Sequence, residues 1–247
     1  MTLTEAVAAL RVLGRPQRLT EYARVGIPND SALGITIPAL RTLARIVGRD
    51  HELALQLWET GIHEARLLAA FIDDPAQVTE SQLERWVSDF DSWDICDGVC
   101  GLFERTPRAW AKAVEWSARE EEFVQRAAFT LVAGFAVHDK DAPDAHFLAF
   151  LPIIRERSSD DRNFVKKAVN WALRNIGKRN GILNVAAIEL AEQIRADGSR
   201  AGRWIAADAL RELRGEAVQA RLLRRESAAG AAETHARVVP PASVRAT

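Results

Sequence analysis

The stretch that decides the fold is DRNFVKKAVNWALRNIGKR, which runs from Asp161 to Arg179. Its apolar residues recur every three or four positions, and each residue of an α-helix advances by about 100°, so they form one stripe along one side. The stripe consists of Val165, Ala168, Val169, Ala172, Leu173 and Ile176. The opposite side carries Lys167, Trp171, Arg174 and Lys178, which places a tryptophan among cations on the side turned away from the core.

The same helical periodicity recurs along the chain, and no stretch shows the sustained apolar/polar alternation of a strand. It predicts thirteen short helices, over residues 4–13, 18–23, 38–47, 51–60, 63–72, 79–89, 93–104, 108–118, 122–136, 143–157, 161–179, 182–196 and 200–214. A pair of such helices is too small to bury its apolar stripes alone, so neighbouring pairs must stack into one core. We therefore predict an all-α, HEAT-like helical-repeat solenoid, an α-α superhelix with a concave basic groove. A single-domain helical bundle is the alternative, because no crisp repeat is visible.

The predicted helices and the composition of the C-terminal residues define the expected domain boundaries. Residues 1–214 are predicted to form the repeat domain, and residues 215–247 a C-terminal tail that is largely disordered from about residue 227.

Two local expectations concern individual helices. Within the helix predicted over 143–157, Pro152 should cause a kink or an end. Thr79 and Gln82 have the spacing of a reciprocal helix cap, in which each side chain satisfies a free backbone N–H group.

The composition indicates a globular chain without a membrane segment. Of its 247 residues, 48% are hydrophobic, which is enough for a sizeable core. No apolar run reaches the roughly eighteen residues of a membrane helix, and the N-terminus lacks the features of a secretory signal. Cys96 and Cys100 lie one helical turn apart, and that spacing suits neither a disulfide framework nor a zinc site, so we interpret them as small buried hydrophobes. We expect a cytoplasmic monomer with no membrane contact, metal or cofactor.

Charge is distributed unevenly along the chain. The net charge is -1, but residues 155–181 contain eight basic and three acidic residues, so this segment carries +5 and the rest carries -6. A local basic face on a nearly neutral molecule can still hold phosphate groups, with fewer contacts than a strongly basic protein makes.

Two further helices place unusual side chains opposite their apolar stripes. In the helix predicted over 93–104, Trp93 and Asp97 lie away from the core, and in the helix over 122–136 Arg126 does so. One interpretation is that each tryptophan packs against a neighbouring helix and that Arg126 is solvated. The other interpretation is that alternate helices line one concave wall. There these residues would converge with Trp171 and with the basic column formed by Lys167, Arg174 and Lys178. Cations hold phosphates, and indole faces pack on sugars or bases, so a carboxylate among them indicates chemistry on a cationic substrate or intermediate. The alternative is that this aspartate caps a helix or pairs with an arginine.

In these segments the sequence resembles the AlkD-like DNA alkylation repair family of HEAT-like repeat glycosylases. The resemblance covers roughly residues 33–179 and is carried by LGITIPALR (33–41), HEAR (63–66), SWDICD (92–97), QRAA (125–128) and FVKKAVNWALR (164–174).

This resemblance implies a DNA glycosylase that excises cationic N3- or N7-alkylated purines from duplex DNA. It would hydrolyse the N-glycosidic bond without extruding the damaged base, unlike most enzymes that act on bases. Asp97 would be the catalytic carboxylate, Trp93 and Trp171 would pack on the deoxyribose, and Arg126 would contact backbone phosphate. The remaining expected DNA contacts are Lys166, Lys167, Arg174, Lys178 and Arg179. The partner would be double-stranded DNA carrying alkylated bases, so the protein would be associated with the nucleoid when bound.

Two other functions stay open at this point: a non-catalytic protein that binds DNA structures on the same scaffold, and a protein–protein interaction solenoid. No lysine is marked as a Schiff-base nucleophile, so no strand-cleaving lyase step is expected. His63-Glu64 begins like a zinc-protease motif, but Leu67 stands where the second histidine would be. We therefore interpret His63 as a helix-end or loop residue.

Overall fold

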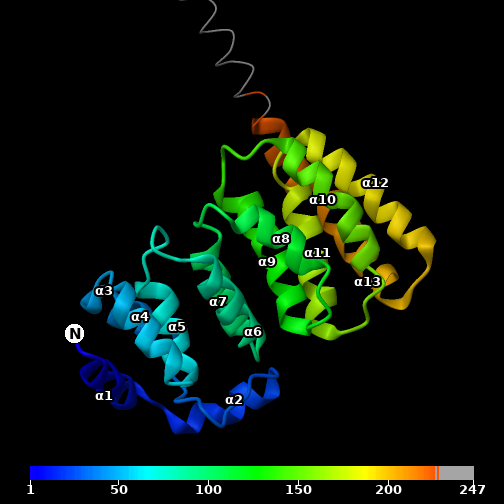
Figure 1. The fold of residues 1–247 in the computed structure, drawn as a ribbon. Coiled ribbons are helices and arrows are strands. Elements are labelled where there is room, and N and C mark those ends of the chain that lie inside the picture. The colour runs from blue at the N-terminus through cyan, green and yellow to red at the C-terminus, as the bar shows by residue number, and fades with distance from the viewer. Residues whose placement is uncertain (226, 228–247) are drawn as a thin grey trace, which may run out of the picture.

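The computed structural model describes residues 1–225 and 227, and this part of the chain contains helices and no strands. Each of the thirteen predicted helices is present, together with one short 3-10 helix (Figure 1). Their bounds are α1 Leu3–Leu13, η1 Pro16–Arg18, α2 Leu19–Arg24, α3 Ile37–Val47, α4 His51–Glu59, α5 His63–Ile72, α6 Glu80–Ser88, α7 Trp93–Phe103, α8 Ala109–Ser117, α9 Glu122–His138, α10 Asp144–Arg157, α11 Asn163–Gly177, α12 Gly181–Asp197 and α13 Arg200–Leu213.

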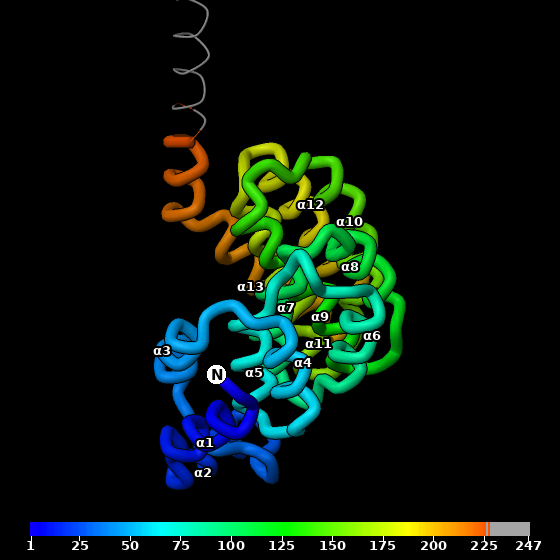
Figure 2. The backbone as a smooth tube through the Cα atoms, turned by 60° about the vertical axis from the view of Figure 1, so that its left-hand side comes forward, coloured from blue at the N-terminus to red at the C-terminus, as the bar shows by residue number. Residues whose placement is uncertain are grey.

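The helices are arranged in two layers that follow chain order. From α3 onward the odd-numbered helices pack side by side, each against the next, as far as α13. The even-numbered helices α4, α8 and α12 pack against the odd-numbered helix that follows each of them. Figures 1 and 2 show the resulting progression from the N-terminal helices at one end to the C-terminal helices at the other. Trp93 and Asp97 on α7, Arg126 on α9 and Trp171 on α11 therefore lie on three adjacent helices of one layer.

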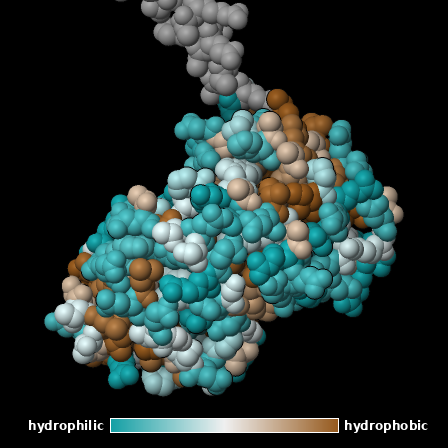
Figure 3. Space-filling view, in the orientation of Figure 1, coloured by the Kyte–Doolittle hydropathy of each residue, from teal (hydrophilic) through white to brown (hydrophobic). Residues whose placement is uncertain are grey.

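A continuous apolar core joins the two layers, and its largest members are tryptophans. The indoles of Trp58 and Trp86 stack with ring centroids 4.1 Å apart, and Trp116 is buried near them. The Trp58 indole N–H donates to Asp89 at 2.8 Å, and that of Trp116 donates to Glu84 at 2.9 Å. Large apolar area is thus buried while these polar atoms keep a partner. Most of the face drawn in Figure 3 is hydrophilic, with hydrophobic residues gathered towards the two ends.

Of the two outcomes expected at Pro152, a kink or an end, the structure excludes the end, because α10 continues through Pro152 to Arg157. A proline inside a helix leaves the carbonyl four residues earlier without its usual donor. Here Pro152 and Leu148 are both exposed, so that carbonyl can be hydrated.

After α13 the chain turns at Gly215, and residues 216–225 form a further helix whose Val218 and Leu222 are buried. The predicted disorder from about residue 227 falls, apart from that residue itself, outside the described part of the chain. No helix within the described residues is both long and apolar enough to cross a membrane.

Candidate functional site

A buried ion pair between α7 and α9 forms the centre of the candidate site. The guanidinium of Arg126 donates to both carboxylate oxygens of Asp97, from Nε to Oδ1 at 3.0 Å and from Nη2 to Oδ2 at 2.8 Å. The hydroxyl of Thr130 donates to the same Oδ1 at 3.2 Å, and Nη1 of Arg126 donates to the carbonyl of Phe164 at 2.8 Å. The Asp97 side chain keeps 24% of its surface exposed, whereas that of Arg126 keeps 7%. The carboxylate can therefore still meet a ligand.

Burial and pairing act in opposite directions on the acidity of Asp97. Burial raises the pKa of Asp97 above its ordinary value, and the charge and hydrogen bonds of Arg126 and Thr130 offset part of this rise. For Arg126, burial lowers the pKa, but the Asp97 carboxylate more than compensates and leaves it raised. The Arg126 guanidinium thus favours the charged form of the Asp97 carboxylate, and burial opposes it.

The ion pair lies in the wall between two hollows. The smaller, about 620 Å³, is lined by Arg24, Val25, Gly26, Trp93, Arg126, Asn163, Phe164 and Lys167, and we call it the central pocket. The larger, about 1500 Å³, extends over α2, α3, α5 and α7 and includes Asp97, and we call it the long groove. Trp93 lines both. Four of the residues that the sequence singled out, Trp93, Asp97, Arg126 and Lys167, thus line these two adjoining hollows.

Trp93 is held in place by the loop that follows α2. Its indole N–H donates to the carbonyl of Val25 at 3.0 Å. The end of this loop is fixed by the fully buried carboxylate of Glu64, which accepts the backbone N–H groups of Leu33, Gly34 and Ile35 at 2.7, 2.7 and 3.0 Å.

Two neighbours complete this loop anchor. The hydroxyl of Tyr22 donates to Glu64 at 3.2 Å, and burial together with the Glu64 charge raises the pKa of Tyr22, so it stays a donor. Gly34 has φ +76°, and a Cβ there would lie 2.3 Å from the Arg15 carbonyl oxygen, so only glycine fits. His63, expected at a helix end or in a loop, begins α5 but is buried, and its Nε2 lies 2.8 Å from Asp94 on α7.

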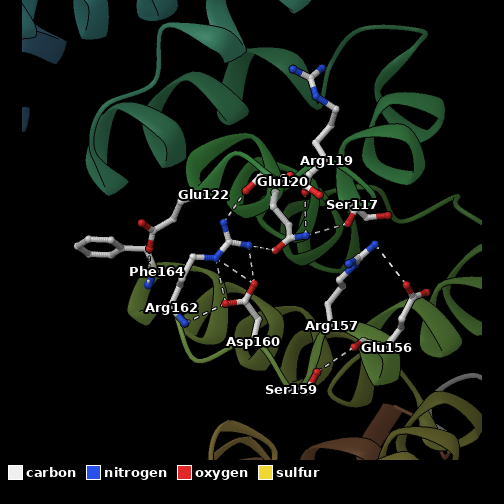
Figure 4. A network of polar contacts seen from close by, with 11 residues as sticks. Ser117, Arg119, Glu120, Glu122, Glu156, Arg157, Ser159, Asp160, Arg162 and Phe164 are labelled. Atoms are coloured by element: carbon white, nitrogen blue, oxygen red, sulfur yellow. Dashed lines mark hydrogen bonds and ion pairs between the residues drawn. The ribbon is translucent and has the colours of Figure 1, made fainter.

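The start of α11 is fixed by a polar network around Arg162 (Figure 4). Arg162 donates to the side chain of Gln125 at 2.8 Å and to both carboxylate oxygens of Asp160. The backbone N–H of Phe164 points to Glu122 at 3.4 Å. This network sets the position of the Phe164 carbonyl, which is the third acceptor of Arg126.

The predicted basic column on α11 is only partly open to a ligand. Lys167 is exposed and lines the central pocket, whereas Trp171 is half-buried and lines neither hollow. Arg174 and Lys178 both contact Glu212 on α13 at 2.7 Å.

The two remaining predicted cations also have partners. The ammonium of Lys166 lies 5.2 Å from the ring centre of Trp204, and Arg179 donates to the backbone carbonyls of Asp139 and Ala142 at 2.6 and 2.8 Å. The concave basic groove therefore stays a prediction.

Besides Arg18, which pairs with Glu21, four arginines that the sequence did not single out as binding residues line the hollows. Arg24 lines the central pocket, and Arg41, Arg45 and Arg105 line the long groove. None of the four forms an ion pair within residues 1–225, and three of them contact neutral groups: Arg41 lies over the Phe71 ring, Arg45 donates to Thr42 and Arg105 donates to the Gly101 carbonyl. They were missed because only the basic cluster of residues 155–181 stands out by local charge density.

Comparison with known proteins agrees with this architecture. Residues 6–213 match the family model described as DNA alkylation repair enzyme. The chain is 23% identical over 199 residues to the uncharacterized protein Lin0241 of Listeria innocua, covering 78% of this chain and 87% of that protein. It is 21% identical over 199 residues to the uncharacterized protein Lmo0209 of Listeria monocytogenes, with the same two coverages.

A solved structure shares the fold with a TM-score of 0.73 at 21% identity, covering 86% of this chain and 96% of the other. It is described as "A new family of proteins related to the HEAT-like repeat DNA glycosylases with affinity for branched DNA structures". The predicted HEAT-like helical-repeat fold is thereby confirmed. Because the family model spans almost all of the helical domain, from α1 to α13, this chain belongs to the family of DNA alkylation repair enzymes.

Proposed function

We propose that the protein is a monofunctional DNA glycosylase that excises cationic N3- and N7-alkylated purines from duplex DNA without flipping the base. The observation that carries this proposal is the Asp97 carboxylate, which is fixed by Arg126 and Thr130 yet open to the long groove beside Trp93. An anion held rigidly in a partly buried site stabilises a developing positive charge better than a mobile one in water does.

The chemistry needs little more than this constellation. An alkylated purine is already positively charged, so it leaves as a neutral base when the bond to the sugar C1′ breaks. The positive charge then moves to the sugar, where Asp97 and the indole face of Trp93 stabilise it. Water adds to C1′ and loses one proton to solvent or to the carboxylate. Arg126 acts here as a positioning residue for Asp97, in addition to the phosphate contact predicted for it.

The cations around the two hollows are the proposed phosphate contacts. Lys167 and Arg24 flank the central pocket, and Arg41, Arg45 and Arg105 extend this set along the long groove. Trp171, one turn after Lys167 on α11, is half-buried and lines neither hollow, so its proposed contact with the deoxyribose requires DNA to follow the α11 face beyond the central pocket. Lys166, Arg174, Lys178 and Arg179 remain candidate contacts nearer the C-terminus. Several dispersed cations can account for DNA affinity despite a net charge of -1.

The direct test is release of free 7-methylguanine from methylated duplex DNA under single-turnover conditions. We expect Asp97→Asn to lower the rate by about 10²- to 10³-fold, the usual effect of removing one electrostatic group of a transition-state site. Asp91→Asn is the matched control, because Asp91 lies in the same segment, is half-exposed and only approaches Arg66 at 3.9 Å. Equal release by both variants would exclude Asp97 from the mechanism, provided that circular dichroism shows both to be folded.

The absence of a lyase step is a separate expectation that concerns Lys167. A lysine that attacked C1′ would form an imine, which borohydride traps as a covalent protein–DNA adduct. Lys167 is the lysine to examine, because it lines the central pocket beside Trp93. We expect free base to be released with no trapped adduct; an adduct that Lys167→Arg abolishes would show a bifunctional enzyme.

A second candidate is a protein that binds DNA structures without catalysis. Two observations favour it: both oxygens of Asp97 are already engaged by Arg126, and the solved relative is described as having affinity for branched DNA. Under this alternative, wild type would bind a four-way junction more tightly than duplex and release no base from methylated DNA.

A further inference from the structure

Two carboxylates of α13 occupy the cations at the C-terminal end of the α11 column. Nη1 of Arg174 lies 2.7 Å from Glu212 and 3.2 Å from Asp208, and Nζ of Lys178 lies 2.7 Å from the other oxygen of Glu212. Asp208 also accepts a hydrogen bond from Asn170 at 2.7 Å. The two acidic residues are one helical turn apart, as are Asn170, Arg174 and Lys178, so the helices meet along a polar ladder.

These cations share a helix face with a residue of the candidate site. Lys167, Arg174 and Lys178 are separated by seven and four positions, so their side chains lie within about 40° of one another around α11. Lys167 lines the central pocket, which means that this face continues from the site along α11. The carboxylates of Asp208 and Glu212 therefore lie where phosphates would bind if DNA followed that face.

The acidic residues of α13 pair with the cations of α11 at the end of the column that lies away from the candidate site. Within the described residues, neither Lys167 nor Arg24 forms an ion pair, whereas Arg174 and Lys178 share Glu212. Burial raises the pKa of Glu212, but the hydrogen bond and charge of Lys178 bring it below its ordinary value, so this group is an anion at neutral pH. The side chains of Glu212 and Arg174 keep 31% and 29% of their surface, so the pair is within reach of solvent and of a ligand.

We propose that Asp208 and Glu212 act as internal competitors for phosphate that suppress binding of undamaged DNA along α11 and so favour engagement at the Trp93–Asp97 site. This inference rests on the proposed function in requiring a DNA ligand, but it does not require catalysis. A phosphate that pairs with Arg174 or Lys178 must displace a carboxylate or bind beside one that repels it, so its favourable free energy is largely cancelled. The preference for the Trp93–Asp97 site over binding along α11 then comes from the repulsion between these two carboxylates and the phosphates of DNA.

The test measures the affinity of the full-length chain for an undamaged fluorescent duplex across a salt series. We expect Glu212→Gln to bind about fivefold more tightly at low salt, the fold-change equivalent to one surface ion pair of about 1 kcal/mol. The slope of log K against log salt should steepen by about 1 for each additional phosphate that the variant neutralises. Asp208→Asn should change affinity in the same direction, and the double variant should change it more.

Glu192→Gln is the matched control, because Glu192 is an exposed residue of α12 paired with Arg214 and its loss changes the net charge equally. The inference is overturned if Glu212→Gln binds no more tightly than wild type, or if the affinity of the control rises as much. Thermal unfolding of each variant guards against a folding defect, and Glu212→Ala repeats the measurement if the amide is poorly tolerated.

The outcome separates this inference from the proposed function. Tighter binding by Glu212→Gln with no base release from any variant supports the competitor role and refutes the glycosylase. Base release by wild type with unchanged affinity in Glu212→Gln does the reverse. If no variant binds duplex at low salt, both fail.

Discussion

Replacing the buried carboxylate of Glu64 by its amide, Glu64→Gln, tests how the Trp93 loop is held. In wild type Oε1 accepts from Tyr22, Gly34 and Ile35, and Oε2 accepts from Leu33. An amide keeps one acceptor oxygen and turns an NH2 group towards the remaining N–H donor. A hydrogen bond to a charged group contributes about 1.5–3 kcal/mol, and a buried unpaired N–H costs about 1–3 kcal/mol. We therefore expect the free energy of unfolding to fall by about 3 kcal/mol.

Urea and thermal unfolding followed by circular dichroism provide the assay. For a chain of this size each kcal/mol shifts the melting temperature by about 2–4 °C, so the loss should be roughly 6–12 °C. Glu59→Gln is the control, because the Glu59 side chain is 61% exposed and, among the described residues, pairs with Arg85 alone; its effect should stay within about 0.5 kcal/mol. A loss below about 1 kcal/mol for Glu64→Gln, or a loss as large in the control, would refute the idea that this carboxylate anchors the loop.

Three further predictions concern acidity and packing. Thr130→Ala removes a donor that lowers the pKa of Asp97, so the acid limb of the pH–rate profile of base release should move to higher pH in single-turnover measurements; an unmoved limb would contradict this. Burial lowers the pKa of His63, but the hydrogen bond and charge of Asp94, together with the charges of Glu64 and Asp91, outweigh burial and leave this pKa above its ordinary value. That stabilisation is complete below the unfolded pKa and is lost as pH rises through the folded one. In urea titrations the difference in unfolding free energy between wild type and His63→Asn should therefore narrow as pH rises above the unfolded pKa; a difference that widens would contradict this prediction. Trp58→Ala should lower the free energy of unfolding by about 3–5 kcal/mol in the same titration, because loss of a fully buried indole leaves a cavity and removes the ring that stacks on Trp86.

Local sequence patterns were sufficient to predict the helices but not every detail of their ends. The stripe of Val165 to Ile176 is buried as predicted, because helical periodicity is a property of consecutive residues. Thr79 caps α6 by accepting the N–H of Gln82 at 3.2 Å. The Gln82 side chain does not reciprocate but donates to Asp73 at 2.7 Å, because a buried carboxylate from a preceding loop competes for it. That α10 does not end at Pro152 depends on the exposure of this position, which the sequence does not show.

The candidate site was predictable only as far as a single helix can reveal it. Periodicity shows that Asp97 and Arg126 lie away from their apolar stripes, but not that they meet, because the pairing depends on how α7 packs on α9. For the same reason the basic column appeared free of acids. Glu212, which neutralises much of it, is 34 residues beyond Lys178 and belongs to another helix. Long-range ion pairs are tertiary information, and net charge over a segment overstates the charge that a ligand meets.

From α3 to α13, each odd-numbered helix packs against its immediate odd-numbered neighbours, and this arrangement has a mechanical consequence. In a layer connected only through successive interfaces, a rotation of a few degrees at each interface adds up along the stack. Arg41 on α3 and Lys178 at the end of α11 could then move apart or together by many ångströms while every local interface keeps its packing. We therefore expect the elastic compliance of the whole layer, more than any single contact, to determine how strongly curved a nucleic acid can bind along it.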